Sequence, residues 1–327
     1  MKKLTAIATL TAGIVSGIAD RIKMFIKKLT PNFILFIYRK YNGADAKEKR
    51  RIKRLEKRII NYLENVSSDK MTDEVREVLD YWKQRHSLSI FPYSYEQKYD
   101  PENVAVYRDN ERDLCYVLHD GKRLYFKKEW NERCIKKYYY KLLAEQDAES
   151  PHRYETSGFH VKDGDVVVDA GVAEGNFALS VIEKVKKIYL FEVDEEWIEV
   201  LKVTFEPWMD KVVIINKYVS DNDENNCVTL DSLLGNERID FIKADIEGAE
   251  IQLCLGAKAI FVLCTYHRHD DAKTLEKILT EKGFNTEFSR GYMIFMYEMY
   301  DKLKPPYLRR GLIRAVKNTD KYEAKEG

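Results

Sequence analysis

Hydrophobic and polar residues along the second half of the chain follow two alternating periods, which predict strands and helices in turn. From Gly164 onward, short β-branched or aromatic runs are separated by segments with apolar residues at helical spacing. This alternation is typical of parallel strands joined by crossover helices in one sheet. The predicted parallel strands are residues 166–169, 188–192, 212–216, 239–244 and 260–265. The sequence therefore predicts an α/β fold, with ligands bound at the carboxyl ends of the strands.

Two further apolar runs predict how the sheet ends. Residues 285–289 and 292–296 flank Arg290 and Gly291, which is the pattern of an antiparallel hairpin. We therefore expect this hairpin to close the sheet. Residues 299–327 contain Pro305 and Pro306 followed by a basic stretch, and we interpret them as a packed basic tail of unknown role.

The first half of the chain has a different pattern. Residues 44–66, 72–86 and 131–146 have helical periodicity, with Thr72 as the expected N-cap of the second helix. Residues 103–107, 113–118 and 124–127 are predicted strands, the latter two joined by a turn at Asp120 and Gly121. Residues 44–149 are thus expected to form an accessory helical and β region beside the main sheet.

The richest chemical signal is the segment 165–177, which reads D-V-V-V-D-A-G-V-A-E-G-N-F. A buried strand ends at Asp169, and Gly171 and Gly175 then allow the backbone to turn and approach a ligand closely. The loop opens a helix, as in nucleotide-type cofactor pockets. The candidate cofactor ligands in this segment are Asp169, Gly171, Glu174, Gly175, Asn176 and Phe177.

Two residues beyond this loop complete the candidate cofactor site. Glu192 ends the next strand about 20 residues later, where a carboxylate can accept both hydroxyls of a ribose. Ser220 is a further candidate on the adenine side. Ala173 stands where a dinucleotide motif would have its second glycine, and Asp169 would repel a pyrophosphate. These features favour S-adenosylmethionine over a nicotinamide dinucleotide.

At these residues the chain resembles a known family, from about residue 150 to residue 295. It is similar to FkbM-type S-adenosylmethionine-dependent methyltransferases. The match is carried by the strings D-A-G-V-A-E-G-N-F at 169–177, F-E at 191–192, T-L-D-S-L-L at 229–234 and K-A-D-I-E-G-A-E at 243–250. Two shorter strings, S-P-H-R-Y at 150–154 and C-T-Y-H-R at 264–268, resemble a bacterial subgroup of that family.

The resemblance implies a fold and a function. The fold would be a seven-stranded class I methyltransferase sheet, Rossmann-like, at residues 150–298. The function would be O-methylation of a sugar or of another hydroxyl on a small molecule or glycan. The accessory region would then line the pocket for the acceptor.

Methyl transfer to a hydroxyl is an in-line displacement, for which positioning and a general base are the main requirements. His267 and Asp245 both follow predicted strand ends and are our candidate catalytic residues. His267 has a structural alternative as a hydrogen-bonded histidine, and Asp245 has one as a ligand of the acceptor or the cofactor. A metal held by Asp245, Glu247 and His267 has no spacing signature, so we predict no metal site.

The charge of the chain is unevenly distributed although its formal net charge is only +1. Residues 1–60 contain roughly 16 Lys and Arg against about 4 acids. Residues 1–43 carry apolar residues at helical spacing among these cations, which predicts a basic amphipathic arm on an anionic membrane surface. The alternatives are a signal peptide and an upstream extension with the natural start near Met24.

The helix predicted at 44–66 is also basic, and its default interpretation is a solvated surface. It carries no aromatic interleaving or recognised nucleic-acid motif, so no nucleic-acid partner is expected. Five scattered cysteines without C-x-x-C spacing favour a reducing cytoplasm. We therefore expect a cytoplasmic enzyme at the inner membrane face. The alternatives are a nicotinamide-dependent oxidoreductase and a non-catalytic, membrane-attached cofactor-binding module.

Overall fold

The computed structural model describes residues 46–85, 89–221, 223, 226–235, 237–246, 249–255, 260–295 and 303–317. The predicted arm 1–43, and with it the choice between membrane arm, signal peptide and extension, lies outside the described residues. The elements are α3 (Ala46–Glu64), α4 (Asp73–Arg85), η1 (Ser94–Lys98), η2 (Pro101–Asn103), β1 (Tyr107–Asp109), β2 (Leu114–His119), β3 (Lys122–Tyr125), α5 (Glu132–Glu145), β4 (Val166–Ala170), α6 (Asn176–Val181), β5 (Lys187–Phe191), α7 (Glu195–Thr204), η3 (Glu206–Trp208), β6 (Val212–Ile215), β7 (Tyr218–Val219), β8 (Cys227–Val228), α8 (Leu230–Leu234), β9 (Phe241–Ala244), α9 (Glu250–Leu255), β10 (Ile260–Cys264), α10 (Asp271–Glu281), β11 (Phe284–Phe288) and β12 (Leu312–Lys317).

The central sheet has seven strands in the order β11-β12-β10-β9-β4-β5-β6. The pairs β4–β5, β5–β6, β4–β9 and β9–β10 are parallel, whereas β12 runs antiparallel to both of its neighbours. The strand order reverses at β4, which lies between β5 and β9, and this is the place where open α/β sheets bind ligands. The seven-stranded class I methyltransferase sheet is confirmed.

The predicted closing hairpin is wrong. β11 pairs with β12, and residues 292–295 form no strand; Met293 makes only an isolated bridge to Arg309. The Ile294 N–H is donated to the Ile90 carbonyl, so this apolar segment packs on the accessory region instead. The true partner strand, β12, lies in the stretch that we interpreted as a basic tail. Arg314 obscured its apolar alternation, yet Arg314 is itself buried and donates to the Arg153 carbonyl at 2.7 Å.

The accessory region contains a small antiparallel sheet, β1-β2-β3. Its β2–β3 turn lies at Asp120 and Gly121, whose φ angles of 50° and 77° suit a tight hairpin, as predicted. The strand expected at 103–107 is wrong, because Pro101–Asn103 forms a 3₁₀ turn and β1 begins only at Tyr107. Asp100 nucleates that turn by accepting the Glu102 N–H at 2.9 Å.

Both faces of the central sheet are covered, as the valine run of β4 requires. Val167 packs into one buried cluster, and Val166 and Val168 pack into the other. The cluster around Val167 continues without a break into the accessory region, where it includes Trp82 of α4 and Tyr138 of α5. The accessory elements are therefore part of the same hydrophobic core as the sheet.

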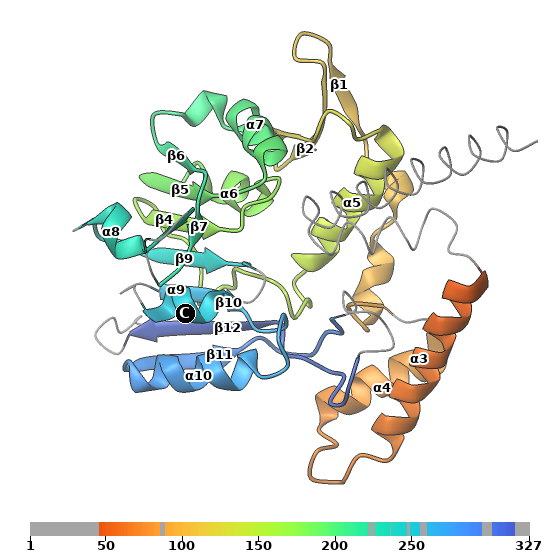
Figure 1. The fold of residues 1–327 in the computed structure, drawn as a ribbon. Helices are drawn as coiled ribbons and strands as arrows, with labels where there is room; N and C mark the ends of the chain where they lie inside the picture. Colours follow the sequence, from red (N-terminus) through yellow and green to blue (C-terminus); the bar gives the residue numbers. More distant parts are fainter. Residues whose placement is uncertain are drawn as a thin grey trace, which may run out of the picture.

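The helix α5 lies beyond the carboxyl ends of the parallel strands, as Figure 1 shows, on the same side of the sheet as the α3–α4 pair. This arrangement places one face of the accessory region opposite the loops that follow β4, β9 and β10. Within the described residues, no helix is both long and apolar enough to cross a membrane.

Candidate active site

Asp245 follows β9 directly and gathers hydrogen bonds from two tyrosines. The Tyr266 hydroxyl lies 3.0 Å from Oδ1, and the Tyr154 hydroxyl donates to Oδ2 at 3.3 Å. Tyr154 belongs to the S-P-H-R-Y string and Tyr266 to the C-T-Y-H-R string, so both motifs meet at this carboxylate. The Asp245 side chain remains 25% exposed although its partners are buried, so it is open to a ligand.

His267 is held between two carboxylates. Its Nε2 lies 3.2 Å from Asp245 Oδ1, and its Nδ1 lies 3.0 Å from Glu250 Oε1. Burial would lower the pKa of His267, but the hydrogen bonds with Asp245 and Glu250 raise it well above its ordinary value. Burial would likewise raise the pKa of Asp245, but the bond to His267 holds it well below its usual range. The pair is therefore an imidazolium and a carboxylate.

These charge states give the two candidate catalytic residues different chemical roles. A paired imidazolium has no lone pair with which to accept a proton, whereas an ionised carboxylate accepts hydrogen bonds. Asp245 is thus the proton or hydrogen-bond acceptor of this pair, and His267 fixes its orientation and charge. That either residue takes part in catalysis stays a prediction.

His152 is a third member of the cluster that the motif analysis did not single out. Its Nε2 lies 3.0 Å from the Tyr266 hydroxyl and 3.8 Å from Asp245 Oδ2. Burial lowers the pKa of His152 to about 4, so the ring is neutral at physiological pH. A neutral ring with its proton on Nε2 can donate to Tyr266 and leave the tyrosine proton for Asp245. The signal for this residue was its place in the S-P-H-R-Y string.

The glycine loop after β4 approaches Asp245 closely. Gly171 has a φ of 75°, and a Cβ at this position would lie 2.0 Å from the Asp245 carbonyl oxygen. Gly175, with a φ of 89°, is the N-cap of α6, where a Cβ would lie 2.9 Å from Leu201 and from Phe205. Both glycines are therefore needed for the path of this loop, as predicted from the sequence.

Asp169 is completely buried at the end of β4. Lys243 Nζ lies 2.9 Å from its Oδ1 and also donates to the Gly171 carbonyl at 2.7 Å. Burial raises the pKa of Asp169, and the lysine offsets this effect only in part. The lysine thus ties the strand end to the loop, and a direct role of Asp169 toward a cofactor stays a prediction.

Glu192 reaches across to the same loop. Its Oε2 accepts the Ala173 N–H at 2.8 Å, and its Oε1 accepts the N–H groups of Val193 and Asp194 at 2.7 and 2.8 Å. The carboxylate is half-buried directly after β5, and its role as a ribose ligand stays a prediction. Ser220 follows β7 in a separate two-stranded sheet and donates to Asp221 at 3.3 Å, so its adenine role stays a prediction.

The remaining loop residues connect the cofactor loop to neighbouring elements. Glu174 is buried and accepts the Tyr138 hydroxyl of α5 at 2.5 Å. Burial raises the pKa of Glu174 to about 7. The Phe177 ring lies edge-on to Tyr154 with centroids 5.6 Å apart, and Asn176 accepts the Phe177 N–H at 2.7 Å. The loop and the Asp245 cluster are therefore in direct contact.

Glu145, at the end of α5, is a second residue of this region, after His152, that the sequence analysis missed. It is half-buried and is close enough to Asp245 and Glu174 to be influenced by their charges. Burial, with those two carboxylates, raises the pKa of Glu145 to about 8. Tyr138 and Glu145 lie two helical turns apart on α5 and therefore share a face, which borders the site.

Two groups of metal-ligand residues occur among the described residues. They are His152, Asp245 and Cys264, and Asp245, Glu250 and His267, with ligand atoms within 4.8 Å of one another in each group. In the second group the two nitrogens of one ring contact different carboxylates, which is the arrangement of an ion-paired imidazolium. Glu247 lies outside the described residues. Our expectation of no metal site stays a prediction.

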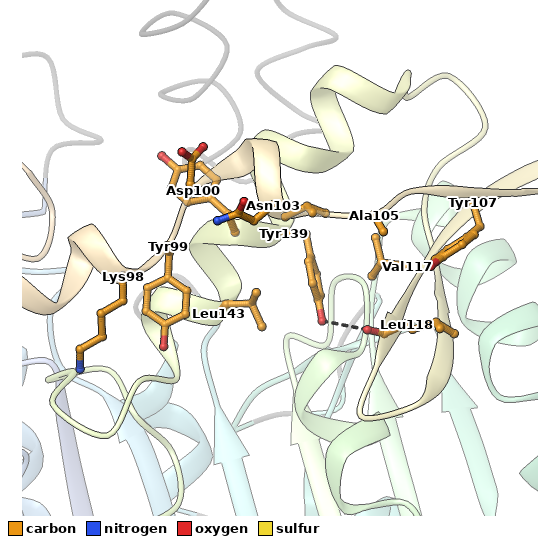
Figure 2. Close-up of a pocket in the computed structure, with 12 residues that line it drawn as sticks. Lys98, Tyr99, Asp100, Asn103, Ala105, Tyr107, Val117, Leu118, Tyr139 and Leu143 are labelled. Carbon is orange, nitrogen blue, oxygen red and sulfur yellow. Dashed lines mark hydrogen bonds between the residues drawn. The ribbon is translucent and has the colours of Figure 1, made fainter.

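A cavity of about 330 Å³ lies elsewhere in the accessory region. Figure 2 shows it between the 98–107 segment, β2 and α5, with the Tyr139 hydroxyl directed toward Leu118. Tyr139 also contacts His119, whose Nε2 lies 2.8 Å from Ser180 Oγ on α6. None of the site residues predicted from the sequence lines this cavity.

The geometry defines a class of protein, a Rossmann-like α/β domain with a glycine loop, a carboxylate at the end of the next strand and a polar cluster at the ends of β9 and β10. Residues 169–301 match the model described as "Methyltransferase FkbM domain". This part of the chain is an FkbM methyltransferase domain, and the family predicted from the sequence strings is confirmed.

Solved structures resemble the chain only in part. A methyltransferase FkbM from Methylobacillus flagellatus KT is 18% identical, with a TM-score of 0.39, over 55% of this chain and 54% of that one. The chain therefore spans about half the length of that structure. A precorrin-6y C5,15-methyltransferase from Geobacter metallireducens GS-15 is 16% identical, with a TM-score of 0.33, over 49% of this chain and 83% of that one.

A Streptococcus mutans protein solved in complex with SAH is 11% identical, with a TM-score of 0.32, over 49% of this chain and 93% of that one. None of the curated proteins compared with the chain matches it. At these scores the structural likeness carries no argument, and the family rests on the domain match.

Proposed function

We propose that this protein transfers the methyl group of S-adenosylmethionine to a hydroxyl oxygen of a sugar, a glycan or another small molecule. The observation that carries the proposal is the position of Asp245. Asp245 follows β9, its backbone carbonyl lies against the glycine loop at Gly171, and its carboxylate receives hydrogen bonds from Tyr154 and Tyr266 within an FkbM methyltransferase domain. An acceptor hydroxyl bound to it would be held beside the cofactor loop.

The residues of the loop fit S-adenosylmethionine. Gly171 allows the loop to pass against the Asp245 carbonyl oxygen, which a Cβ would prevent, and Glu192 presents a half-buried carboxylate at the place expected for a ribose. The bound cofactor would supply a sulfonium methyl group as the electrophile. Ala173 disfavours a pyrophosphate here by its size, and Asp169 disfavours it by its charge.

The Asp245 cluster would bind and orient the acceptor. Asp245 accepts the hydrogen bond of the acceptor hydroxyl, while Tyr154 and Tyr266 hold the carboxylate in place. Because the pKa of Asp245 is depressed, the carboxylate is a weak base, and it receives the hydroxyl proton late, as the oxygen–carbon bond forms. Orientation of the reacting oxygen toward the methyl carbon is then its main contribution.

The chemistry of Asp245 and Glu145 supports a hydroxyl acceptor. Asp245 accepts hydrogen bonds, and Glu145 can both donate and accept one, because its raised pKa of about 8 keeps it protonated at neutral pH. A site with both hydrogen-bond donors and acceptors suits the neighbouring hydroxyls of a sugar. The proposal therefore favours sugars and glycans.

Transfer from ¹³C-methyl S-adenosylmethionine tests the proposal. The full chain is incubated with pools of nucleotide sugars, free sugars and glycan extracts, and new methyl signals are followed by carbon NMR. A new methoxy signal supports the proposal. A methyl group found on nitrogen or carbon, or no transfer to any pool by a protein that binds the cofactor, would overturn the hydroxyl assignment.

The alternatives considered from the sequence have less support. Neither the domain match nor the glycine loop supports a nicotinamide-dependent oxidoreductase, because Ala173 stands where a dinucleotide motif has its second glycine. A non-catalytic cofactor-binding module would show no activity that depends on His267 or Asp245. The methyl transfer activity of the Asp245→Asn variant separates that case from an enzyme.

A further inference from the structure

The exposed side of α3 is a continuous basic surface. Arg50, Lys53, Arg54 and Lys57 follow the spacing i, i+3, i+4, i+7, which places them on one stripe of the helix. All four are exposed, and the exposed residues Arg51 and Arg58 flank the stripe. We call these six residues the α3 basic face.

The opposite side of α3 is fully used in packing. Leu55, Ile59 and Leu63 are each at most 2% exposed and share a buried cluster with Trp82 of α4. Tyr62 packs edge-on against Tyr307 with centroids 5.3 Å apart. The helix is therefore fixed to the body of the protein. It cannot turn its apolar stripe toward a membrane without unfolding, so any contact through α3 is made by its charges.

The four cations of the central stripe are not neutralised by neighbouring acids among the described residues. Among the described residues, Arg50, Lys53, Arg54 and Lys57 form no ion pair. Glu56, the one acid within 50–58, is buried on the packed side with 9% exposure. The neighbouring helix α4 differs, because its exposed cations stand beside acids such as Asp73, which pairs with Arg76 at 2.7 Å.

We propose that the α3 basic face docks the protein on a bilayer surface rich in anionic lipid headgroups. Each Lys or Arg near such a surface contributes to binding, and a row of four on one stripe can contact the headgroup plane together. Residues 1–43, which precede α3, have the sequence pattern of a basic amphipathic membrane-surface segment. The two features are independent and favour the same partner.

A nucleic acid is the other polyanion that such a face could bind, and the observations favour it less. Sequence-tolerant nucleic-acid surfaces combine cations with exposed aromatic rings for base stacking. The α3 basic face has no aromatic residue, and the ring of Tyr62 is engaged by Tyr307. A headgroup layer needs only charge, which is what the face supplies.

Vesicle co-sedimentation of the full chain tests this inference. Vesicles of phosphatidylcholine with phosphatidylglycerol are compared with vesicles of phosphatidylcholine alone. The test variant is Arg50→Gln/Lys53→Gln/Lys57→Gln, whose side chains make no described contact. The matched control is Lys273→Gln/Lys277→Gln/Lys282→Gln, which removes the same charge from the exposed side and end of α10. Circular dichroism and S-adenosylmethionine binding verify that each variant is folded.

We expect binding to the anionic vesicles that falls roughly 100-fold in the α3 variant and little in the α10 variant. Added salt should weaken the binding of the wild type more than that of the α3 variant. Equal binding by wild type and the α3 variant would overturn the inference, as would equal binding to both kinds of vesicle. Salt-sensitive binding to a mixed-sequence RNA that depends on α3, without vesicle binding, would overturn it in favour of nucleic acid.

Discussion

Nε2 of His267 lies 3.2 Å from Oδ1 of Asp245, and this contact joins the end of β10 to the end of β9. The contact stabilises both charged forms, so Asp245 remains a carboxylate and His267 remains a protonated imidazolium. Glu250 lies on the far side of the ring, with its Oε1 3.0 Å from Nδ1, so the ring stands between two carboxyl groups. The proposed acceptor site is therefore built around a carboxylate whose protonation does not change near neutral pH.

Nuclear magnetic resonance of the imidazole nitrogens tests this ionisation. The pKa of His267 is raised well above 6.5 and that of His152 is lowered to about 4, so at pH 7 the first ring should be charged and the second neutral. On titration from about pH 5 to pH 8, neither ring should change its protonation state in the folded protein. A His267 signal that titrates near 6.5 would contradict the ion pair with Asp245.

The substitution Asp245→Asn should remove most of the methyl transfer and spare the cofactor. The amide keeps the shape of the side chain but cannot accept the hydroxyl proton, so we expect kcat to fall by about 10²–10⁴-fold. The dissociation constant for S-adenosylmethionine should change by less than about threefold, which corresponds to about 0.6 kcal/mol. Asp163→Asn, at an exposed position, is the control. An Asp245→Asn enzyme with wild-type kcat would show that this carboxylate is not used.

The substitution Gly171→Ala should damage both the fold and the cofactor site. The added Cβ would lie 2.0 Å from the Asp245 carbonyl oxygen at a φ of 75°, so we expect a loss of about 3 kcal/mol or more in the free energy of unfolding. Gly158→Ala, whose Cβ would meet no atom within 4 Å, should change it by less than about 0.5 kcal/mol. Urea denaturation measures both. Similar stability of the two variants would be inconsistent with the close approach of the loop.

The substitution Glu174→Gln should show a pH-dependent gain in stability. Burial raises the pKa of Glu174 from 4.5 to about 7, so the folded state favours the protonated form. The stabilising effect of this group is complete below 4.5 and is lost as the pH rises through about 7. A glutamine side chain does not ionise, so the variant does not lose stability in this way as the pH rises. Between about pH 4 and pH 8 the variant should therefore gain about 3 kcal/mol relative to the wild type, because one pKa unit is worth about 1.4 kcal/mol.

Urea denaturation of both proteins across this pH range measures that difference. The Tyr138 hydroxyl can still donate to the glutamine oxygen, so the hydrogen bond seen at 2.5 Å does not confound the comparison. Parallel stability curves for the wild type and the variant would mean that Glu174 is not buried in the way described.

The parts of the fold that could be predicted from the sequence have strong local signals. β4 opens with three valines and β9 with Phe241 and Ile242, and a carboxylate follows β5, so their place in a parallel sheet follows from burial on both faces. The glycine loop was also predictable, because Gly171 and Gly175 have positive φ angles that other residues disfavour. β12 was missed because its pattern depends on Arg314, whose burial is decided by a distant partner, the Arg153 carbonyl.

The candidate site likewise contains some residues that could be predicted from the sequence and others that could not. Asp245, Glu192 and His267 follow strand ends, and the topology of a parallel sheet brings such residues to one edge. His152 and Glu145 lie outside the sheet, in the segment before β4 and at the end of α5. Their position beside Asp245 depends on how the accessory region packs. No periodicity in the sequence specifies that packing, so these two residues needed the structure.

Calorimetric titration of the full chain with S-adenosylmethionine, S-adenosylhomocysteine and NADH tests the central claim most directly. Glu192→Gln is titrated beside the wild type, with the exposed Glu199→Gln as the matched control. We predict binding of the first two ligands only, weakened about 10-fold or more in Glu192→Gln because a hydrogen bond to a charged group is lost, and unchanged in the control. Binding of NADH without S-adenosylmethionine, or no binding of any of the three, would contradict the methyltransferase account.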